Sequence, residues 1–156
     1  MRVLFVCTGN TCRSALAEAL AREAIGALRL DGVKVSSAGV HAWTGAPASD
    51  GALLVALENA LDLSGHRARA VDKELLAAQD LVLVMSPHHL ERVEALGAKG
   101  RAHLLSSYAS RGESTRAIAD PFGGDLAAYR EAYDDLRREV YAAMERLAEE
   151  RAPNDS

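Results

Sequence analysis

The chain alternates short apolar runs, rich in β-branched residues, with longer segments of helical periodicity, and this order constrains the fold more than any other feature. The apolar runs predict four strands, at residues 3–6, 33–37, 81–85 and 102–105. The periodic segments predict five helices, at residues 13–27, 49–61, 73–78, 87–96 and 125–149. This order is typical of a parallel sheet with helices on both faces. We therefore predict an α/β three-layer sandwich built on one four-stranded parallel sheet.

The longest predicted helix, at residues 125–149, indicates how the layers pack. Its apolar residues fall three or four positions apart, so one face can dock on the sheet. With 156 residues and 49% hydrophobic composition, the chain is long enough to bury one core. We predict a single domain over residues 1–151 and a frayed tail at residues 152–156. Residues 39–47 and 106–124 are predicted as loops, and the length of the second favours a functional role.

Charge and cysteine content exclude several classes of protein. The 18 basic and 22 acidic residues give a formal net charge of -4, without the basic excess of nucleic-acid binders. No stretch approaches the ~18 consecutive apolar residues of a membrane span, and the first apolar run is too short for a signal peptide. Cys7 and Cys12 are too close in sequence to close a useful disulfide loop. The sequence predicts a soluble, cytoplasmic protein with no nucleic-acid or membrane partner.

A strand, a short polar loop and a helix start follow one another near the N-terminus. In VLFVCTGNTCRSALAEAL, the strand ends at Cys7 and the helix begins near Arg13 and Ser14. The loop between them consists of Thr8, Gly9, Asn10, Thr11 and Cys12. In open α/β sheets ligands bind at the carboxyl ends of strands, and a helix start presents unpaired N–H groups to an anion. We predict that residues 8–14 form a phosphate-binding loop.

Three residue types give this loop its chemistry. The loop amides and the helix start favour the thiolate form of Cys7, which makes Cys7 a candidate nucleophile. Arg13 can reach back across the loop and bind two oxygens of a tetrahedral oxyanion. Ser14 can donate a hydrogen bond to the sulfur. The alternative for Cys7 is an ordinary buried strand cysteine. A structural zinc site is excluded because two cysteines with no neighbouring histidine cannot supply four ligands. A Walker-type nucleotide loop is excluded because its residues have a different spacing.

The stretch CTGNTCRS has the C-x5-R-S signature of the low-molecular-weight protein tyrosine phosphatase family, which the chain resembles over nearly its whole length. The resemblance implies a cysteinyl-phosphate intermediate on Cys7, a phosphate-binding Arg13 and an aspartic acid in a late D-P motif. Asp120-Pro121 in ADPFGG matches that motif, so Asp120 is the expected general acid and base. By itself, Asp120 would be interpreted as a turn residue before proline. No metal or other cofactor is implied, because Arg13 and the loop amides supply positive potential.

Two further segments resemble stretches of the same family. In SSAGV, Ser37 is expected to brace the phosphate loop through Asn10. In GHRAR, His66 is expected to join the same polar network, although a purely structural role stays open. Asn10 also tolerates a left-handed backbone better than most residues, which suits a tight loop.

The substrate is left open between two phosphorylated side chains. Trp43 lies where the family commonly has an aromatic pocket wall, which suits phosphotyrosine. Thr11 stands where tyrosine-directed members have a larger aliphatic residue, and the branch resembling protein-arginine phosphatases has threonine there together with DPFGG. Phe122 replaces the first of two tyrosines often found after the D-P motif, and it is a further candidate for the wall. We expect a phosphorylated protein or peptide as substrate, with phosphotyrosine as the main prediction and phosphoarginine as the alternative. We also expect inorganic phosphate or similar oxyanions to bind as ligands.

Two other functions are compatible with part of the pattern. Some arsenate reductases share this fold and loop, but they pass the oxidation to cysteines further along the chain, and here none follows Cys12. An anion-binding module without turnover would need neither the nucleophile Cys7 nor the acid Asp120. Both functions are therefore less favoured than a phosphatase. Cys12 is also positioned in the sequence to capture an oxidised Cys7 as a disulfide, a candidate redox control.

Overall fold

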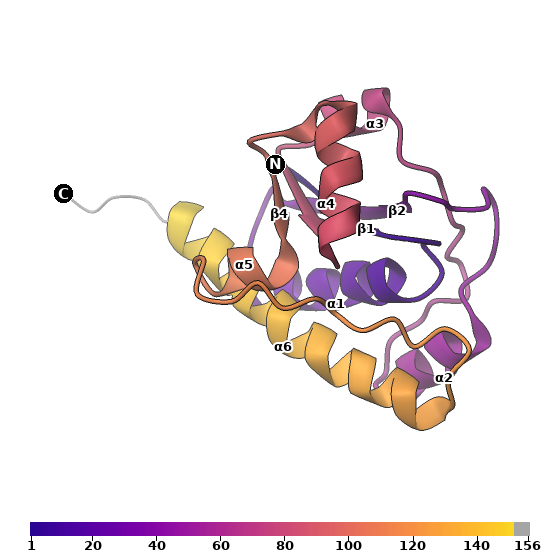
Figure 1. The fold of residues 1–156 in the computed structure, drawn as a ribbon. Helices are drawn as coiled ribbons and strands as arrows, with labels where there is room; N and C mark the ends of the chain where they lie inside the picture. Colours follow the sequence, from indigo (N-terminus) through magenta and orange to yellow (C-terminus); the bar gives the residue numbers. More distant parts are fainter. Residues whose placement is uncertain (152–156) are drawn as a thin grey trace.

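A four-stranded parallel sheet in the order β2-β1-β3-β4 forms the middle layer of the protein (Figure 1). The computed structural model describes residues 1–151, and the predicted tail lies outside these residues. The strands are β1 (Arg2–Cys7), β2 (Lys34–Gly39), β3 (Leu81–Val84) and β4 (Ala102–Leu104). β1 lies between β2 and β3, with Cys7 opposite Gly39 and Val6 opposite Val84. The carboxyl ends of these three strands meet at one edge, where ligands bind in open α/β sheets.

Four helices cover one face of the sheet. They are α1 (Arg13–Leu28), α2 (Asp50–Glu58), α5 (Leu105–Ala109) and α6 (Leu126–Arg151). α6 packs along α1, which agrees with the apolar face predicted from its periodicity (Figure 1). Phe5 of β1 shares a buried core with Leu16 of α1 and with Leu136 and Met144 of α6. Removing such side chains from water stabilises the fold by about 25 cal/mol per Å² of apolar area.

The opposite face of the sheet carries a second, smaller core. It is covered by α3 (Lys73–Ala77), α4 (Pro87–Val93) and a π-helical turn, η1 (Glu94–Ala98). Leu4 and Val6 of β1 point to this face, where they pack with Val82, Leu76 and Val93. β1 is therefore apolar at successive positions because both of its faces are covered, as in other central parallel strands. The predicted α/β sandwich with a four-stranded parallel sheet is confirmed.

Several predicted boundaries differ from the structure: the helix predicted at residues 49–61 ends at Glu58, and β2 extends to Gly39. Two further differences have a clear physical cause. The segment predicted as a loop at residues 106–124 begins within a short helix, α5, because Leu105 and Tyr108 are buried in the core beside α6. The helix predicted at residues 87–96 changes type within this range, since α4 ends at Val93 and continues into η1, where Gly97 has a φ of 106°. Tertiary packing decides whether such short helices form, and periodicity alone does not show it.

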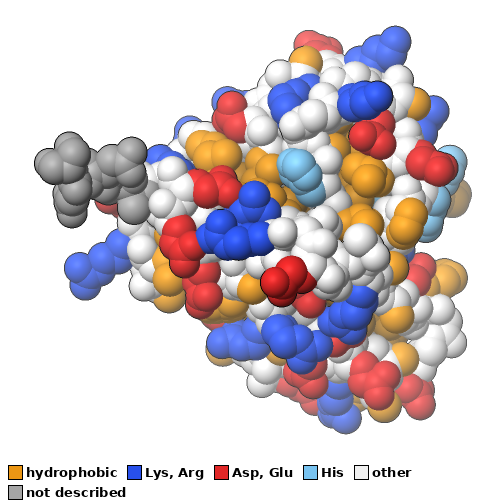
Figure 2. Space-filling model, turned by 60° about the vertical axis from the view of Figure 1, so that its left-hand side comes forward, with side chains coloured by type: hydrophobic (Ala, Val, Ile, Leu, Met, Phe, Trp, Pro, Cys, Tyr) orange, Lys and Arg blue, Asp and Glu red, His pale blue; other side chains and the backbone are white. Residues whose placement is uncertain are grey.

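The surface carries charges of both signs. Figure 2 shows Lys, Arg, Asp and Glu side chains interspersed on the face in view, with hydrophobic atoms between them. This mixture agrees with the small formal net charge of -4 and is typical of solvated faces. No helix within residues 1–151 combines the length and the apolar character needed to cross a bilayer.

Candidate active site

The chain turns sharply between β1 and α1, and this turn forms the centre of the candidate site. Asn10 has a φ of 56°, a left-handed conformation that asparagine tolerates better than most residues. The chain that follows β2 holds the turn in place. The N–H of Val40 donates to the Cys7 carbonyl at 3.0 Å, and the N–H of His41 donates to the Thr8 carbonyl at 2.9 Å. The structure therefore contains the predicted strand, loop and helix start.

Cys7 and Cys12 have different surroundings although both are buried. The Sγ atom of Cys7 lies 2.9 Å from Oγ of Ser14, and the Ser14 N–H donates to the same sulfur at 3.4 Å. The backbone N–H of Ser14 therefore donates to the sulfur, whereas in the contact between the Ser14 hydroxyl and the sulfur either atom can be the donor. Burial raises the pKa of the Cys12 thiol to about 12, and the charges of Cys7 and Asp120 act in the same direction. Cys12 is therefore a neutral thiol at pH 7, which leaves Cys7 as the candidate nucleophile.

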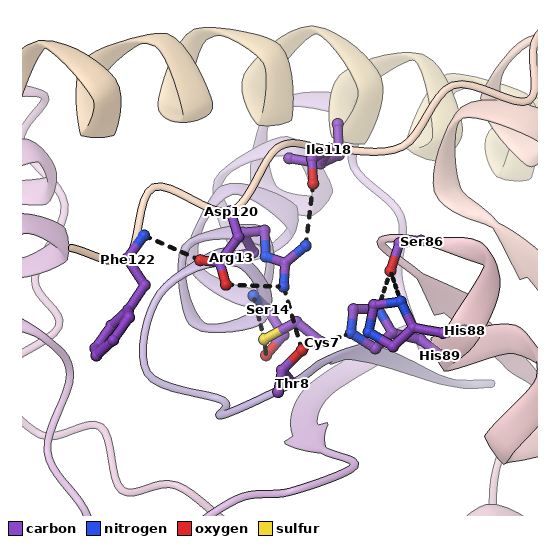
Figure 3. A network of polar contacts seen from close by, with 10 residues as sticks. All are labelled: Cys7, Thr8, Arg13, Ser14, Ser86, His88, His89, Ile118, Asp120 and Phe122. Carbon is purple, nitrogen blue, oxygen red and sulfur yellow. Dashed lines mark hydrogen bonds and ion pairs between the residues drawn. The ribbon is translucent and has the colours of Figure 1, made fainter. Parts of the chain in front are cut away.

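The guanidinium of Arg13 is held from three directions (Figure 3). Its Nη1 donates to the Ile118 carbonyl at 3.0 Å, and its Nη2 donates to Thr8 Oγ1 at 3.4 Å. The same Nη2 lies 3.6 Å from Oδ2 of Asp120. Arg13 is only 4% exposed, so this planar cation has a fixed orientation beside the loop. A fixed fork of N–H groups is what bidentate binding of a tetrahedral oxyanion requires.

Asp120 comes from the loop between α5 and α6, a distant part of the chain. The loop is anchored by Ile118, which is 2% exposed and whose N–H donates to the Met85 carbonyl at 2.9 Å. The Asp120 side chain is 49% exposed, and its Oδ1 accepts a hydrogen bond from the Phe122 N–H at 3.0 Å. A half-exposed carboxyl group at this position can exchange protons with both a bound substrate and water.

A cavity of about 220 Å³ lies between the phosphate-binding loop and Asp120. It is lined by Cys7, Thr8, Gly9, Thr11, Cys12, Arg13, Asp120 and Phe122. The structure thus brings these predicted residues to one place. Trp43 is not in this lining; it is 85% exposed in the segment after β2. Of the three residues predicted to form the pocket wall, Thr11 and Phe122 border the cavity and Trp43 does not.

Asn10 and Ser14 lie behind the cavity, in a buried polar network. The amide nitrogen of Asn10 donates to Ser14 Oγ at 2.8 Å and to Ser37 Oγ at 2.9 Å. The amide oxygen of Asn10 accepts the Arg69 N–H at 3.0 Å, and Nε2 of His66 lies 2.6 Å from the Asn10 carbonyl oxygen. The supporting residues predicted from the sequence are therefore in contact with Asn10, and Arg69 joins them. Such a network fixes the left-handed turn at the loop's centre.

A larger cavity, of about 510 Å³, borders this supporting network and not the nucleophile. Its lining includes Glu18, Arg22, Ser37, His66 and Arg69. Neither cysteine lines it, so cavity size does not locate the chemistry in this protein. The smaller cavity is the candidate active site because it contains the nucleophile, the cation and the carboxyl group.

Sequence reasoning missed one group of polar residues, at the carboxyl end of β3. Ser86, His88 and His89 lie where α4 begins, and His89 is 0% exposed. Nε2 of His89 lies 2.8 Å from Oγ1 of Thr8 (Figure 3). A signal was present, since the stretch SPHH directly follows the predicted third strand. Carboxyl ends of neighbouring parallel strands share one edge, so polar residues there were candidates for the site.

These residues supply the parts that covalent phosphoryl transfer requires. Cys7 is the candidate nucleophile, Arg13 and the loop amides can provide positive potential, and Asp120 is the candidate proton donor and acceptor. Within residues 1–151, no three His, Cys, Asp or Glu side chains are grouped to hold a metal ion. The fold and the site together define a cysteine-dependent phosphatase.

Comparisons with known proteins identify the family. The model of the low molecular weight phosphotyrosine protein phosphatase family matches residues 2–153. A protein-arginine-phosphatase of Geobacillus stearothermophilus is 38% identical over 151 residues, which are 96% of this chain and 97% of that protein. The low molecular weight protein-tyrosine-phosphatase Etp of Escherichia coli K12 is 36% identical over 148 residues, 94% of either chain. A solved structure of a YwlE arginine phosphatase variant, with a phosphorylated active-site serine, superposes with a TM-score of 0.90 and has 31% sequence identity. The matched region includes 97% of this chain and 98% of the YwlE chain. The chain therefore belongs to the low molecular weight phosphotyrosine protein phosphatase family.

Proposed function

We propose that this protein hydrolyses phosphotyrosine in proteins or peptides through a cysteinyl-phosphate intermediate on Cys7. The observation that carries the proposal is the convergence of Cys7, Arg13 and Asp120 on one cavity. Simple anion binding requires neither a nucleophile nor a proton donor, so this combination favours turnover.

In the first step, the Cys7 thiolate attacks phosphorus and the bond from phosphorus to the leaving oxygen breaks. Asp120, in its acid form, transfers its proton to that oxygen, so a neutral phenol leaves. Arg13 and the loop amides bind the other phosphate oxygens and stabilise the charge that develops on them. The two Ser14 contacts hold the Cys7 sulfur in place at the cavity before attack and when it is released.

In the second step, water attacks the phosphorus of the intermediate. The Asp120 carboxylate takes a proton from this water, the bond between sulfur and phosphorus breaks, and inorganic phosphate leaves. Asp120 returns to its acid form and Cys7 to a thiolate, so the cycle is closed. The half-exposed position of Asp120 supports both roles because it reaches solvent as well as the cavity.

A similar structure supports a covalent step. The YwlE variant mentioned above carries a phosphoryl group on its active-site serine. By similarity, we propose that the phosphoryl group is transferred to the Cys7 side chain in this protein.

Phosphoarginine is a second candidate substrate, favoured by Thr11. Thr11 borders the cavity with a short polar side chain, which leaves room for a planar guanidinium, whereas the aromatic wall predicted at Trp43 lies elsewhere. The relative of Geobacillus stearothermophilus described above is named a protein-arginine-phosphatase. Phe122, which also borders the cavity, is the residue available to contact a phosphotyrosine ring.

The cellular compartment belongs to the same proposal. Cys7 and Cys12 are both free thiols, and a thiolate mechanism requires a reducing environment. We propose the cytoplasm.

The experiment compares phosphate release from matched phosphotyrosine and phosphoarginine peptides under reducing, metal-free conditions, with Cys7→Ser as the control. We expect hydrolysis by the wild type and none by the variant. A kcat/KM at least about tenfold higher for phosphotyrosine supports the main proposal, and the reverse preference supports the second candidate. Activity that persists in Cys7→Ser, or a wild type inactive on both peptides, contradicts the mechanism.

Thr11→Ile serves as the selectivity variant in this experiment. If Thr11 favours the guanidinium, the larger aliphatic side chain lowers the ratio of phosphoarginine to phosphotyrosine hydrolysis by about tenfold, a free-energy difference of about 1.4 kcal/mol. An unchanged ratio would show that Thr11 does not select the substrate.

A further inference from the structure

His89 is a buried imidazole beside the active site that the proposed reaction steps do not use. It is 0% exposed and lies near the start of α4, directly after β3. β3 pairs with β1, with Val84 opposite Val6, so the end of β3 lies next to the start of the phosphate-binding loop. This pairing places Nε2 of His89 2.8 Å from Oγ1 of Thr8, within hydrogen-bonding distance (Figure 3).

Both ring nitrogens of His89 have partners. Nδ1 lies 3.0 Å from Oγ of Ser86, and the same hydroxyl lies 2.9 Å from Nδ1 of His88. At the other end, Thr8 Oγ1 accepts a hydrogen bond from Arg13 Nη2 at 3.4 Å. A continuous series of contacts therefore runs from the guanidinium through Thr8, His89 and Ser86 to His88.

His89 is uncharged in this environment. Burial lowers the pKa of its imidazole to about 3, and the nearby His88, Arg13 and His41 act in the same direction. A neutral imidazole has one N–H donor and one nitrogen acceptor. Its two contacts must therefore have opposite directions, one accepting and one donating.

The donors and acceptors fit one direction along the series. Arg13 has only donors, so Thr8 Oγ1 accepts from it and its hydroxyl hydrogen is free to be donated to His89 Nε2. Nδ1 of His89 then carries the ring hydrogen and donates to Ser86 Oγ, whose hydroxyl donates to His88 Nδ1. In this order each hydroxyl donates once and accepts once.

We propose that Thr8 and His89 are positioning residues for Arg13: His89 orients the Thr8 hydroxyl, and the Thr8 oxygen holds one end of the guanidinium. The inference rests on the phosphate-binding role of Arg13 in the proposed function. The Ile118 carbonyl holds Nη1 while Thr8 holds Nη2, so the planar fork is fixed at both ends. The N–H groups that remain are then pre-oriented for phosphate, which lowers the cost of ordering Arg13 in the transition state.

The first test removes the hydroxyl while keeping the side-chain shape. We expect Thr8→Val to lower kcat for an aryl phosphate about tenfold and Thr8→Ser to retain activity, because serine keeps the oxygen. His89→Gln is expected to lower kcat by a similar factor. The control His103→Gln changes a half-buried histidine of β4 outside the series and should leave kcat unchanged. Thermal unfolding of each variant verifies that it is folded.

A double-mutant cycle separates positioning from direct action. In the Arg13→Lys background, Thr8→Val should have no further effect on the Kd for inorganic phosphate, because the group that Thr8 positions is gone. In the wild-type background the same change should weaken phosphate binding several-fold. An equal loss in both backgrounds would mean that Thr8 acts without Arg13, and the inference would be wrong.

The position of the ring hydrogen of His89 provides a separate test, because a purely structural role would not require that hydrogen to lie on one particular nitrogen. Nitrogen-15 NMR of the wild type should show His89 neutral at pH 6, with its hydrogen on Nδ1. A hydrogen on Nε2 would overturn the proposed direction. If Thr8→Val and His89→Gln keep the full activity of the wild type, the inference is wrong and the proposed function stands. If the wild type itself does not hydrolyse an aryl phosphate, the proposed function is wrong.

Discussion

Asp120 owes its proposed role to its surroundings, because an aspartic acid before proline is otherwise an ordinary turn residue. The Ile118 anchor brings the loop to the end of β3, and the Asp120 carboxylate lies 3.6 Å from Arg13 at the cavity. Cys12 shows the same dependence on surroundings. Burial raises the pKa of its thiol to about 12, and the nearby charges of Cys7 and Asp120 act in the same direction.

Asp120→Asn tests the proton-transfer role. The amide keeps the size of the side chain but cannot donate a proton as an acid, so kcat should fall by about 10²- to 10³-fold. The loss should be greatest for poor leaving groups and smaller for p-nitrophenyl phosphate, which leaves with little protonation. Steady-state kinetics on both substrates measure it.

Asp125→Asn is the matched control for this prediction. Asp125 belongs to the same loop, and its Oδ1 accepts the Ala128 N–H at 3.0 Å at the start of α6. Asparagine caps a helix about as well as aspartate, so activity and stability should stay near wild type. Equal rates for Asp120→Asn and the wild type would contradict the acid/base assignment.

The element that most directly supports the loop is the end of β2. Gly39 lies opposite Cys7, and a Cβ at this position would meet the Thr8 carbonyl oxygen at 2.4 Å and the Asn10 nitrogen at 2.9 Å. Both contacts involve backbone atoms, so neither can be relieved by a side-chain rotation. The phosphate-binding loop thus depends on a close backbone approach that only glycine permits.

Gly39→Ala is expected to displace the phosphate-binding loop. Overpacking of this kind costs about 1–3 kcal/mol in the free energy of unfolding, and phosphate affinity should fall as well. Gly26→Ala is the control, since a Cβ there meets nothing within 4 Å and Gly26 lies in α1. That change should stabilise the helix by about 0.5–1 kcal/mol. Chemical denaturation and phosphate titration distinguish the two, and a Gly39→Ala protein as stable as the wild type would contradict the steric argument.

For the molecule as a whole, burial of neutral His89 makes stability depend on pH. The pKa of His89 falls from 6.5 to about 3 on folding, so below pH 6.5 the unfolded chain binds a proton that the folded chain does not. Stability is therefore unaffected by this group above pH 6.5 and falls as the pH drops towards 3. The slope approaches about 1.4 kcal/mol per pH unit.

His89→Gln removes this titration. Between pH 7 and pH 5, the free energy of unfolding of the variant should fall by about 2 kcal/mol less than that of the wild type. Urea denaturation at the two pH values measures the difference, and the other titrating groups cancel because both proteins carry them. Equal losses in the two proteins would show that His89 has the same pKa in the folded and unfolded states, and would contradict the prediction.

The sequence was sufficient to predict much of the fold and the strand, loop and helix start that carry Cys7 and Arg13. The apolar runs and helical periods predicted a parallel α/β sandwich, because both patterns follow directly from which faces are buried. The spacing from Cys7 to Arg13 could be interpreted locally because all the residues belong to one strand, one loop and one helix start. Asp120, Ser37 and His66 were found through resemblance to a family and not through any local pattern.

Only the tertiary structure decided which distant residues meet at the loop. The pairing of β3 with β1 places His89 against Thr8, and the packing of Ile118 on the end of β3 places Asp120 beside Arg13. In the tertiary structure, Trp43 is also exposed outside the cavity, and α5 forms within a segment predicted as a loop. Periodicity reports which side chains are buried within one element, whereas contacts between elements depend on strand order and packing, which a single sequence does not display.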